Sequence, residues 1–113
     1  MTETEFHRSA EAVLSGLETA LEQPAILDRI DLECSRSGNV LEIEFVDNGT
    51  KIIINSQAPM REMWVAAKSG GFHYRHDGQA WRNTRDGSEL FAALSRMVSE
   101  QGQADVVIGD VST

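Results

Sequence analysis

The hydrophobic period of the sequence changes twice, and these changes restrict the fold more than any other feature. Up to residue 21, apolar residues recur at spacings of three and four, as on one face of an α-helix. Between residues 30 and 83, short segments alternate apolar and polar side chains, which is typical of half-buried β-strands. A helical spacing returns near residue 90. We therefore expect an α+β, two-layer sandwich with both helices on one face of an antiparallel sheet.

The first helix is expected over residues 3–22. Thr2 and Glu5 fit a capping box, in which their side chains accept hydrogen bonds from each other's backbone N–H, and Pro24 marks the far end. The second helix is expected to open near Asp86 and Glu89 and to stop at Gly102. The stripe that must be buried on the first helix is Phe6, Ala10, Val13, Leu14, Leu17 and Leu21.

Five to six strands fit the alternating region, and turn signals separate them. Asp47-Asn48-Gly49-Thr50 contains the Asn-Gly pair that a type I′ hairpin prefers. The tail, residues 104–113, can add an extended segment, and the whole chain, residues 1–113, is expected to form one domain. The expected strands cover residues 30–34, 41–45, 51–55, 62–67, 72–75 and 80–83.

Composition excludes several classes of protein. The longest apolar runs fall short of the roughly 20 residues that span a bilayer, and no export leader is visible, so no membrane partner is expected. The net charge of −8 would repel the phosphates of a nucleic acid. Cys34 is the only cysteine, which excludes an intramolecular disulfide, and its alternation with Ile30 and Leu32 predicts a core position. A reducing compartment, the cytoplasm, fits best.

The negative charge is concentrated at the start of the chain. Residues 1–50 hold 11 acids and 3 bases, whereas residues 51–113 hold 7 of each. If the first helix lies beside the edge strand, the acids of both elements converge into what we call the acidic ridge. Its members are His7, Glu11, Glu18 and Glu22 on the helix, Asp28 in the connection, and Asp31 and Glu33 on the first strand.

Oxygen ligands with an occasional imidazole suit hard or borderline cations such as iron, manganese, calcium and magnesium. The ridge therefore predicts weak, open binding of a cation or of a basic protein surface. The like charges of Glu18 and Glu22, four residues apart on a helix, cost roughly 0.2–0.5 kcal/mol. The alternative is that the ridge is only the solvated face of an amphipathic helix.

Few other residues suggest chemistry. His73 and His76 have a His-x-x-His spacing, but a strand places them on opposite faces, which disfavours a shared metal. No nucleophile motif or phosphate-binding loop is present in the sequence. Trp64 points to the open face of the sheet in one register of its strand and into the core in the other, and periodicity alone does not decide. Trp81 is expected inside, near the second helix.

Several spaced motifs resemble the frataxin family, in its bacterial, CyaY-type branch. The resemblance covers nearly the whole chain, from Glu5-Phe6-His7-Arg8 through the segment Asn48 to Asn55. It continues as Asn55-x-Gln57-x-Pro59, then Met63-Trp64, Gly70-Gly71-Phe72-His73-Tyr74, and Gly78 with Trp81.

The resemblance implies a helix–sheet–helix sandwich that is not an enzyme. It implies weak, exposed binding of ferrous or ferric iron, other divalent cations being possible, and docking on cysteine desulfurase near the iron–sulfur scaffold protein. A monomer is implied, with iron-dependent oligomers possible. The implied metal ligands are His7, Glu11, Glu18, Glu22, Asp31 and Glu33, and the implied partner contacts are Glu18, Glu22, Asn55, Gln57 and Trp64, with Trp64 exposed.

Two alternatives remain open at this point. One is an iron-oxidising or iron-storage oligomer, although the sequence lacks the paired Glu-x-x-His motifs of a di-iron bundle. The other is an acidic protein-interaction module with no role for a metal.

Overall fold

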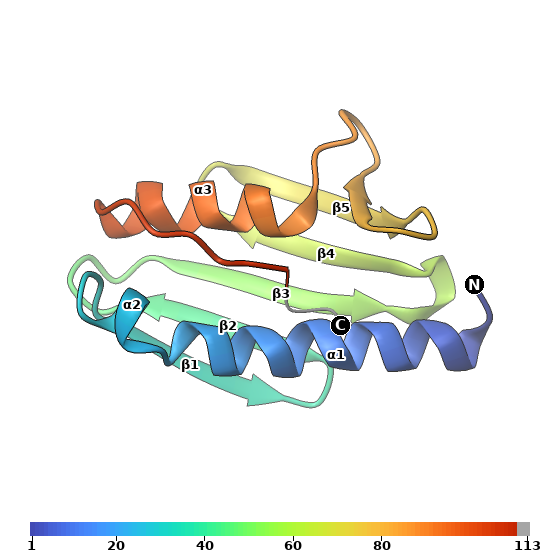
Figure 1. Ribbon diagram of the computed structural model, residues 1–113, viewed down its shortest axis with the longest axis horizontal. Coiled ribbons are helices and arrows are strands. Elements are labelled where there is room, and N and C mark those ends of the chain that lie inside the picture. Colours follow the sequence, from blue (N-terminus) through green and yellow to red (C-terminus); the bar gives the residue numbers. More distant parts are fainter. Residues whose placement is uncertain (111–113) are drawn as a thin grey trace.

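The computed structural model describes residues 1–110, which form a twisted sheet covered on one side by helices. The six strands follow one another across the sheet in sequence order, and each pairs antiparallel with the next (Figure 1). This confirms the expected α+β sandwich and the upper end of the expected strand count. The strands are β1 (Leu32–Ser37), β2 (Val40–Phe45), β3 (Lys51–Gln57), β4 (Glu62–Ala67), β5 (Gly70–His76) and β6 (Trp81–Asn83).

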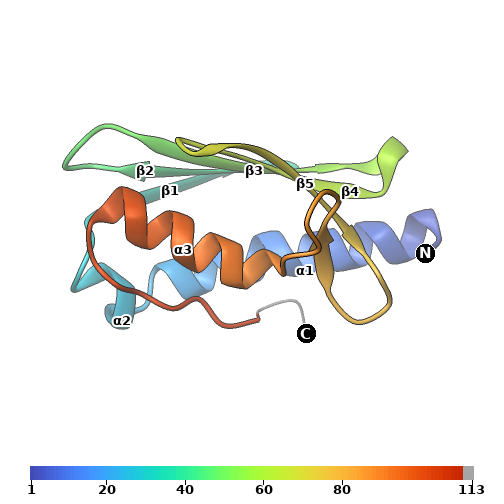
Figure 2. The same cartoon turned by 90° about the horizontal axis from the view of Figure 1, so that it is seen from above.

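Both long helices lie on the same face of the sheet, and the opposite face is open (Figure 2). They are α1 (Glu3–Leu21) and α3 (Leu90–Gly102). The capping box at the start of α1 is present, with Glu5 N donating to Thr2 Oγ1 at 3.1 Å. Glu89 caps α3, because its carboxylate accepts from the backbone N–H groups of the first turn. None of the helices within residues 1–110 is long and apolar enough to cross a membrane.

The core lies between the helices and the sheet. The whole predicted stripe of α1 is buried against alternate residues of the strands. Met63 and Val65 of β4 face the helices, so Trp64 between them faces the open side, as the resemblance implied. Trp81 is 1% exposed and packs edge-on against Phe6, which confirms its expected core position.

The connection between α1 and β1 differs from the prediction. It contains a short helix, α2 (Pro24–Leu27), which Pro24 opens at a position where a missing N–H costs nothing. Ile30, expected in the first strand, lies before β1 and is buried. Spacing in the sequence did not indicate α2, because a single helical turn is too short to show a periodic apolar stripe. A 3-10 turn, Ala58–Met60, joins β3 to β4.

The loop after β2 is also different from the predicted two-residue type I′ turn. A type I′ turn needs positive φ at both central residues, but only Gly49, with φ of 72°, has it. Asn48 instead uses its side chain: its Oδ1 accepts from Thr50 N at 3.0 Å, and its Nδ2 donates to the Gln101 carbonyl at 2.8 Å. The loop is thereby tied to the end of α3.

Gly102 ends α3 as expected, but for a different physical reason. The left-handed residue at the helix end is Gln103, with φ of 57°. A Cβ on Gly102 would lie 2.4 Å from Ile30 Cδ1, so glycine is needed for close packing of α3 on the α2–β1 connection.

The described part of the tail, residues 104–110, runs beside α3 without joining the sheet (Figure 1). Two serines one helical turn apart hold it. Ser99 Oγ accepts from Val106 N at 3.0 Å, and Ser95 Oγ accepts from Ile108 N at 2.8 Å. The rest of the predicted extended tail, residues 111–113, lies outside the described residues.

Candidate functional site

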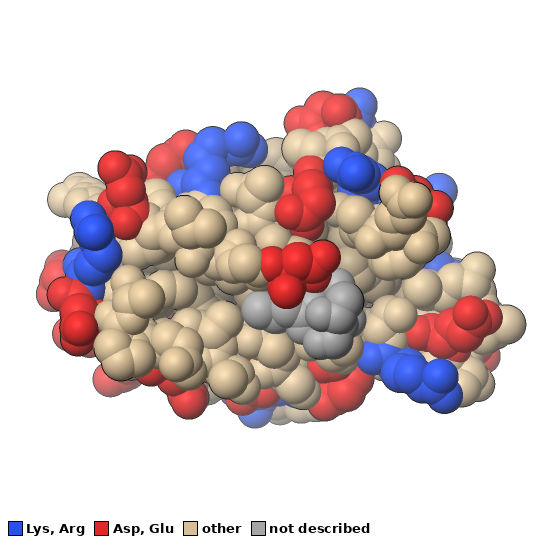
Figure 3. Space-filling view, in the orientation of Figure 1, with Lys and Arg blue, Asp and Glu red and all other residues tan. Residues whose placement is uncertain are grey.

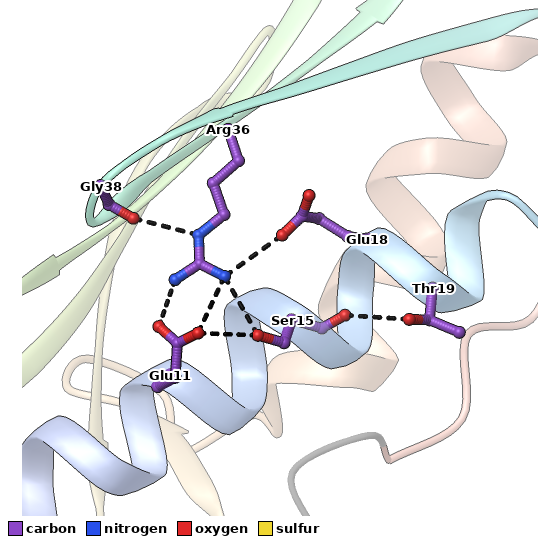
Figure 4. Close-up of polar contacts among 6 residues, drawn as sticks. All are labelled: Glu11, Ser15, Glu18, Thr19, Arg36 and Gly38. Atoms are coloured by element: carbon purple, nitrogen blue, oxygen red, sulfur yellow. Dashed lines mark hydrogen bonds and ion pairs between the residues drawn. The ribbon is translucent and has the colours of Figure 1, made fainter.

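An arginine lies in the middle of the helical part of the acidic ridge (Figure 4). Arg36 Nη1 is 3.2 Å from Glu11 Oε1 and 3.2 Å from Glu18 Oε1, and Nη2 contacts the second oxygen of Glu11. Nη1 also donates to Ser15 Oγ at 3.1 Å, and Nε donates to the Gly38 carbonyl at 3.0 Å. The Arg36 side chain is only 17% exposed, whereas that of Glu11 is 62% exposed. The cation therefore lies beneath the carboxylates.

Simple spacing rules bring these groups together. Glu11, Ser15 and Glu18 are separated by four and three residues, so they share one face of α1. Arg36 follows Cys34 by two residues on β1, and its side chain therefore points to the helical side of the sheet. The result is a contact between the face of α1 and the edge strand.

The arrangement changes the charge that this part of the ridge presents. Hydrogen bonds from Arg36 and Ser15 hold the pKa of Glu11 below its usual range. Hydrogen bonds to Glu11 and Glu18 raise the pKa of Arg36 despite its burial. The guanidinium therefore offsets part of the negative charge of the two carboxylates that it contacts.

The other ridge carboxylates occupy different places. Glu22 is exposed at the end of α1, Asp31 is exposed before β1, and Glu33 is exposed on the open side of β1, in register with Glu44. Burial, together with the charges of Glu22 and Glu18, raises the pKa of the Cys34 thiol to about 11. The half-buried Cys34 packs against the core, as expected.

His7 lies apart from these carboxylates, near the start of α1. Its Nε2 is 3.6 Å from Glu3 Oε1, and it shares a shallow hollow of about 120 Å³ with Glu11 and Arg36. On the helical face, carboxylates lie along the rim and also near the centre, and uncharged residues cover most of the surface (Figure 3). Within residues 1–110 no three His, Cys, Asp or Glu side chains are grouped so that they could hold a metal ion. The six implied metal ligands thus stay a prediction, without a three-ligand centre.

The second candidate site is on the open face of the sheet, on β3, β4 and β5. Asn55, Trp64 and His73 are in register across the three strands, and Gln57 is in register with Glu62. The rings of Trp64 and His73 stack, with centroids 4.3 Å apart and an angle of 6° between their planes. The implied partner contacts Asn55, Gln57 and Trp64 are therefore neighbours, and all three are half-buried.

A buried carboxylate lies within this surface. The Glu62 side chain is 4% exposed, and its oxygens accept from Trp64 Nε1 at 3.0 Å and from Arg75 Nη2 at 2.6 Å. His73 Nδ1 is 3.5 Å from Glu62 Oε1. Burial alone would raise the pKa of Glu62, but the hydrogen bonds from Trp64 and Arg75 and the charges of Arg75 and His73 outweigh it, so the pKa is lowered. We call Glu62, Trp64, His73 and Arg75 the open-face block.

Comparison with known proteins places the chain. The pattern of the frataxin-like domain matches residues 1–104. The chain belongs to the frataxin family. The iron–sulfur cluster assembly protein CyaY of Herminiimonas arsenicoxydans is 64% identical over 110 residues, which are 97% of this chain and 98% of that protein. CyaY of Janthinobacterium sp. (strain Marseille) is 63% identical over 112 residues, covering 99% of this chain and 100% of that protein.

Solved structures agree with this assignment to the frataxin family, which is non-enzymatic. Frataxin from Psychromonas ingrahamii superposes with a TM-score of 0.85 at 29% identity, covering 97% of this chain and 100% of that one. Trimeric frataxin from Saccharomyces cerevisiae, complexed with ferrous iron, superposes with a TM-score of 0.70 at 26% identity, covering 84% and 86% of the two chains.

Sequence reasoning missed two residues of this frataxin-family chain, Arg36 and Glu62. The two-residue alternation of β1 could have placed Arg36 on the helical side, opposite Glu11 and Glu18. The alternation of β4 puts Glu62 on the same face as Trp64, but nothing in its spacing indicates that it is buried there. The separation of His73 and His76 is confirmed, because His73 stacks on Trp64 while His76 packs edge-on against Trp81.

Proposed function

We propose that this protein is an iron-binding regulator of iron–sulfur cluster assembly that docks on cysteine desulfurase, close to the scaffold protein. Membership of the frataxin family and the similarity to bacterial iron–sulfur cluster assembly proteins CyaY support the role in assembly. The yeast frataxin complexed with ferrous iron supports a role for iron. The proposed form is a monomer, and iron-dependent oligomers are compatible with the proposal.

One observation carries the proposal: the excess negative charge of the chain lies in residues 1–50, on carboxylates of α1, the α1–β1 connection, β1 and β2, most of them exposed. Such a one-sided field attracts a basic surface and speeds its encounter with the ridge. Glu18 and Glu22 contact the desulfurase there, and Asn55, Gln57 and Trp64 contact a partner at the open face. Because exposed charges are screened by salt, binding weakens as ionic strength rises.

Iron is held weakly by the same ridge. Carboxylate oxygens and an imidazole suit ferrous and ferric iron, and the proposed ligands are His7, Glu11, Glu18, Glu22, Asp31 and Glu33. Arg36 competes for Glu11 and Glu18, so Glu22, Asp31 and Glu33 are the ligands that a cation reaches without displacing the guanidinium. Water completes the coordination.

Binding to purified cysteine desulfurase, measured at low and high ionic strength with and without ferrous iron, tests partner and mechanism together. We expect binding at low ionic strength that weakens with salt. Absence of binding at every ionic strength would overturn the proposed docking.

A second candidate is an acidic interaction module with no role for a metal, which the lack of a three-ligand group within residues 1–110 favours. Amide NMR during titration with iron separates the two. Broadening confined to α1 and β1 supports an iron site on the ridge, and an unchanged spectrum supports the second candidate.

A further inference from the structure

Glu62 is a buried carboxylate on the open face of the sheet. Its residue is 3% exposed, although no helix covers this face. An ionised group is costly to bury unless it is paired and hydrogen-bonded. Glu62 meets this requirement through Trp64, Arg75 and His73, and all three of these side chains belong to the open face rather than to the core.

The strand register explains why these groups meet. Glu62 is directly opposite Arg75 and Trp64 is directly opposite His73 on adjacent antiparallel strands, so the four side chains form a square. Glu62 contacts each of the other three, and the Trp64 and His73 rings stack on each other. The indole is thereby fixed at its Nε1 edge and along one ring face.

We propose that Glu62 is a positioning residue, which holds the Trp64 indole stacked on His73 in the orientation that a protein partner recognises. This inference rests on the proposed function, in which Trp64 contacts a partner at the open face. Glu62 does not touch that partner itself but orders Trp64 before the contact forms. A large aromatic side chain that is already ordered loses less conformational freedom on binding. Trp64 is half-exposed, so it remains accessible to a partner while Glu62 below it does not.

The burial pattern also indicates what the partner meets. The negative charge of Glu62 is buried and paired with Arg75 inside the block, whereas the side chains of Arg75 and His73 are 60% and 48% exposed. The block therefore presents an indole beside hydrogen-bond donors. A partner segment with an apolar side chain next to a carboxylate or carbonyl oxygen fits this surface.

The test compares Glu62→Leu, which removes the acceptor, with Glu62→Gln, which keeps an oxygen for the indole. Glu44→Leu on β2 is the matched control, because Glu44 lies on the same face but pairs with Glu33 and Lys51. Desulfurase affinity is measured for each variant, alone and combined with Trp64→Ala. NMR order parameters of the indole N–H are measured in the free proteins, with the Trp64 signal assigned by Trp64→Phe.

We expect Glu62→Leu to mobilise the Trp64 indole and to weaken binding about three- to tenfold. Glu62→Gln should restore most of the order, Glu44→Leu should leave the indole unchanged, and Glu62→Leu should have no further effect in the Trp64→Ala background. An equally ordered indole in Glu62→Leu, or the same loss of affinity without Trp64, would overturn the proposal.

A measurement on the wild-type protein guards against a variant that does not fold. The Trp64 indole N–H should be as ordered as that of the buried Trp81, and a mobile Trp64 would overturn the positioning role. This measurement involves no partner. If the desulfurase fails to bind the wild type, the proposed docking fails, and the indole order still decides whether Glu62 positions Trp64.

Discussion

The acidic ridge and the open-face block combine carboxylates and arginine in opposite orders. In the ridge the cation is inside and the anions are outside: the Arg36 side chain is 17% exposed and that of Glu11 is 62% exposed. In the block the anion is inside and the cation is outside: the Glu62 side chain is 4% exposed and that of Arg75 is 60% exposed. In each region the buried partner fixes the exposed groups, and the exposed groups determine what is attracted.

The difference assigns different tasks to the two regions. The ridge presents net negative charge over a long edge, which acts at a distance and is weakened by salt. The block presents a stacked indole held by short hydrogen bonds, which acts on contact and depends little on salt. Docking should therefore consist of electrostatic attraction by the ridge and a preordered contact at Trp64.

The largest expected effect comes from reversing the ridge. Glu18→Lys with Glu22→Lys should weaken desulfurase binding about 10- to 100-fold while the fold is retained, because attraction turns into repulsion. Affinity by calorimetry and folding by circular dichroism measure this. The control Glu100→Lys with Asp105→Lys has the same change in net charge outside the ridge. Equal losses in the two double variants would show that only net charge matters.

Removing the indole comes next. Trp64→Ala should weaken binding about 30-fold, the size expected when a central aromatic anchor is lost. Because Trp64 Nε1 donates to the buried Glu62, the melting temperature should fall by a few degrees while the protein remains folded. Undiminished affinity in a folded Trp64→Ala protein would remove the block from the interface.

Removing the arginine from the ridge should strengthen binding rather than weaken it. Arg36→Gln removes the cation between Glu11 and Glu18, and we expect binding of ferrous iron or of the desulfurase to strengthen about two- to fivefold. The melting temperature should fall by a few degrees, because the contact between α1 and β1 is lost. Weaker binding in this variant would show that Arg36 itself contacts the partner.

Acid should destabilise the block. The pKa of Glu62 in the folded protein lies below the 4.5 of the free side chain, so the unfolded state binds this proton more readily. Stability from Glu62 is therefore present above about pH 4.5 and is lost as pH falls through the lower, folded value. Melting temperatures measured down to pH 3 should fall more steeply for the wild type than for Glu62→Gln, and parallel curves would contradict this.

The smallest effect reports the field of the ridge without any partner. Burial, together with Glu22 and Glu18, raises the pKa of Cys34 to about 11, so the thiol remains protonated and reacts slowly at neutral pH. Glu18→Lys with Glu22→Lys should accelerate alkylation of Cys34 by iodoacetamide about twofold, because one cause of the raised pKa is removed. An unchanged rate would mean that burial alone governs this thiol.

Periodicity was sufficient to predict most of the fold. The stripe from Phe6 to Leu21 and the alternation through β1 to β6 report which side of each element is buried, and the structure confirms these assignments. The short helix α2, the five-residue loop at Asn48 and the close approach of Ile30 to Gly102 were beyond its reach. Each depends on a contact between segments distant in the sequence, or is too short to repeat a pattern.

The candidate sites show the same limit. Spacing placed the ridge carboxylates on α1 and β1 and placed Trp64 on one face or the other of β4. It did not place Arg36 beneath Glu11, or Arg75 and His73 beside Glu62, because these contacts depend on how α1 lies on the sheet and on the register of β4 with β5. Residue type and hydrophobic period predict which face of a single helix or strand a residue lies on. A site also depends on which faces of different elements pack together.

The most direct test of the division between ridge and block is the salt dependence of desulfurase affinity in three proteins: wild type, Glu18→Lys with Glu22→Lys, and Trp64→Ala. The account predicts that the plot of log Kd against log salt concentration flattens or reverses in the ridge variant and keeps the wild-type slope, at weaker affinity, in Trp64→Ala. A slope that is the same in all three proteins, or that changes only in Trp64→Ala, would contradict it.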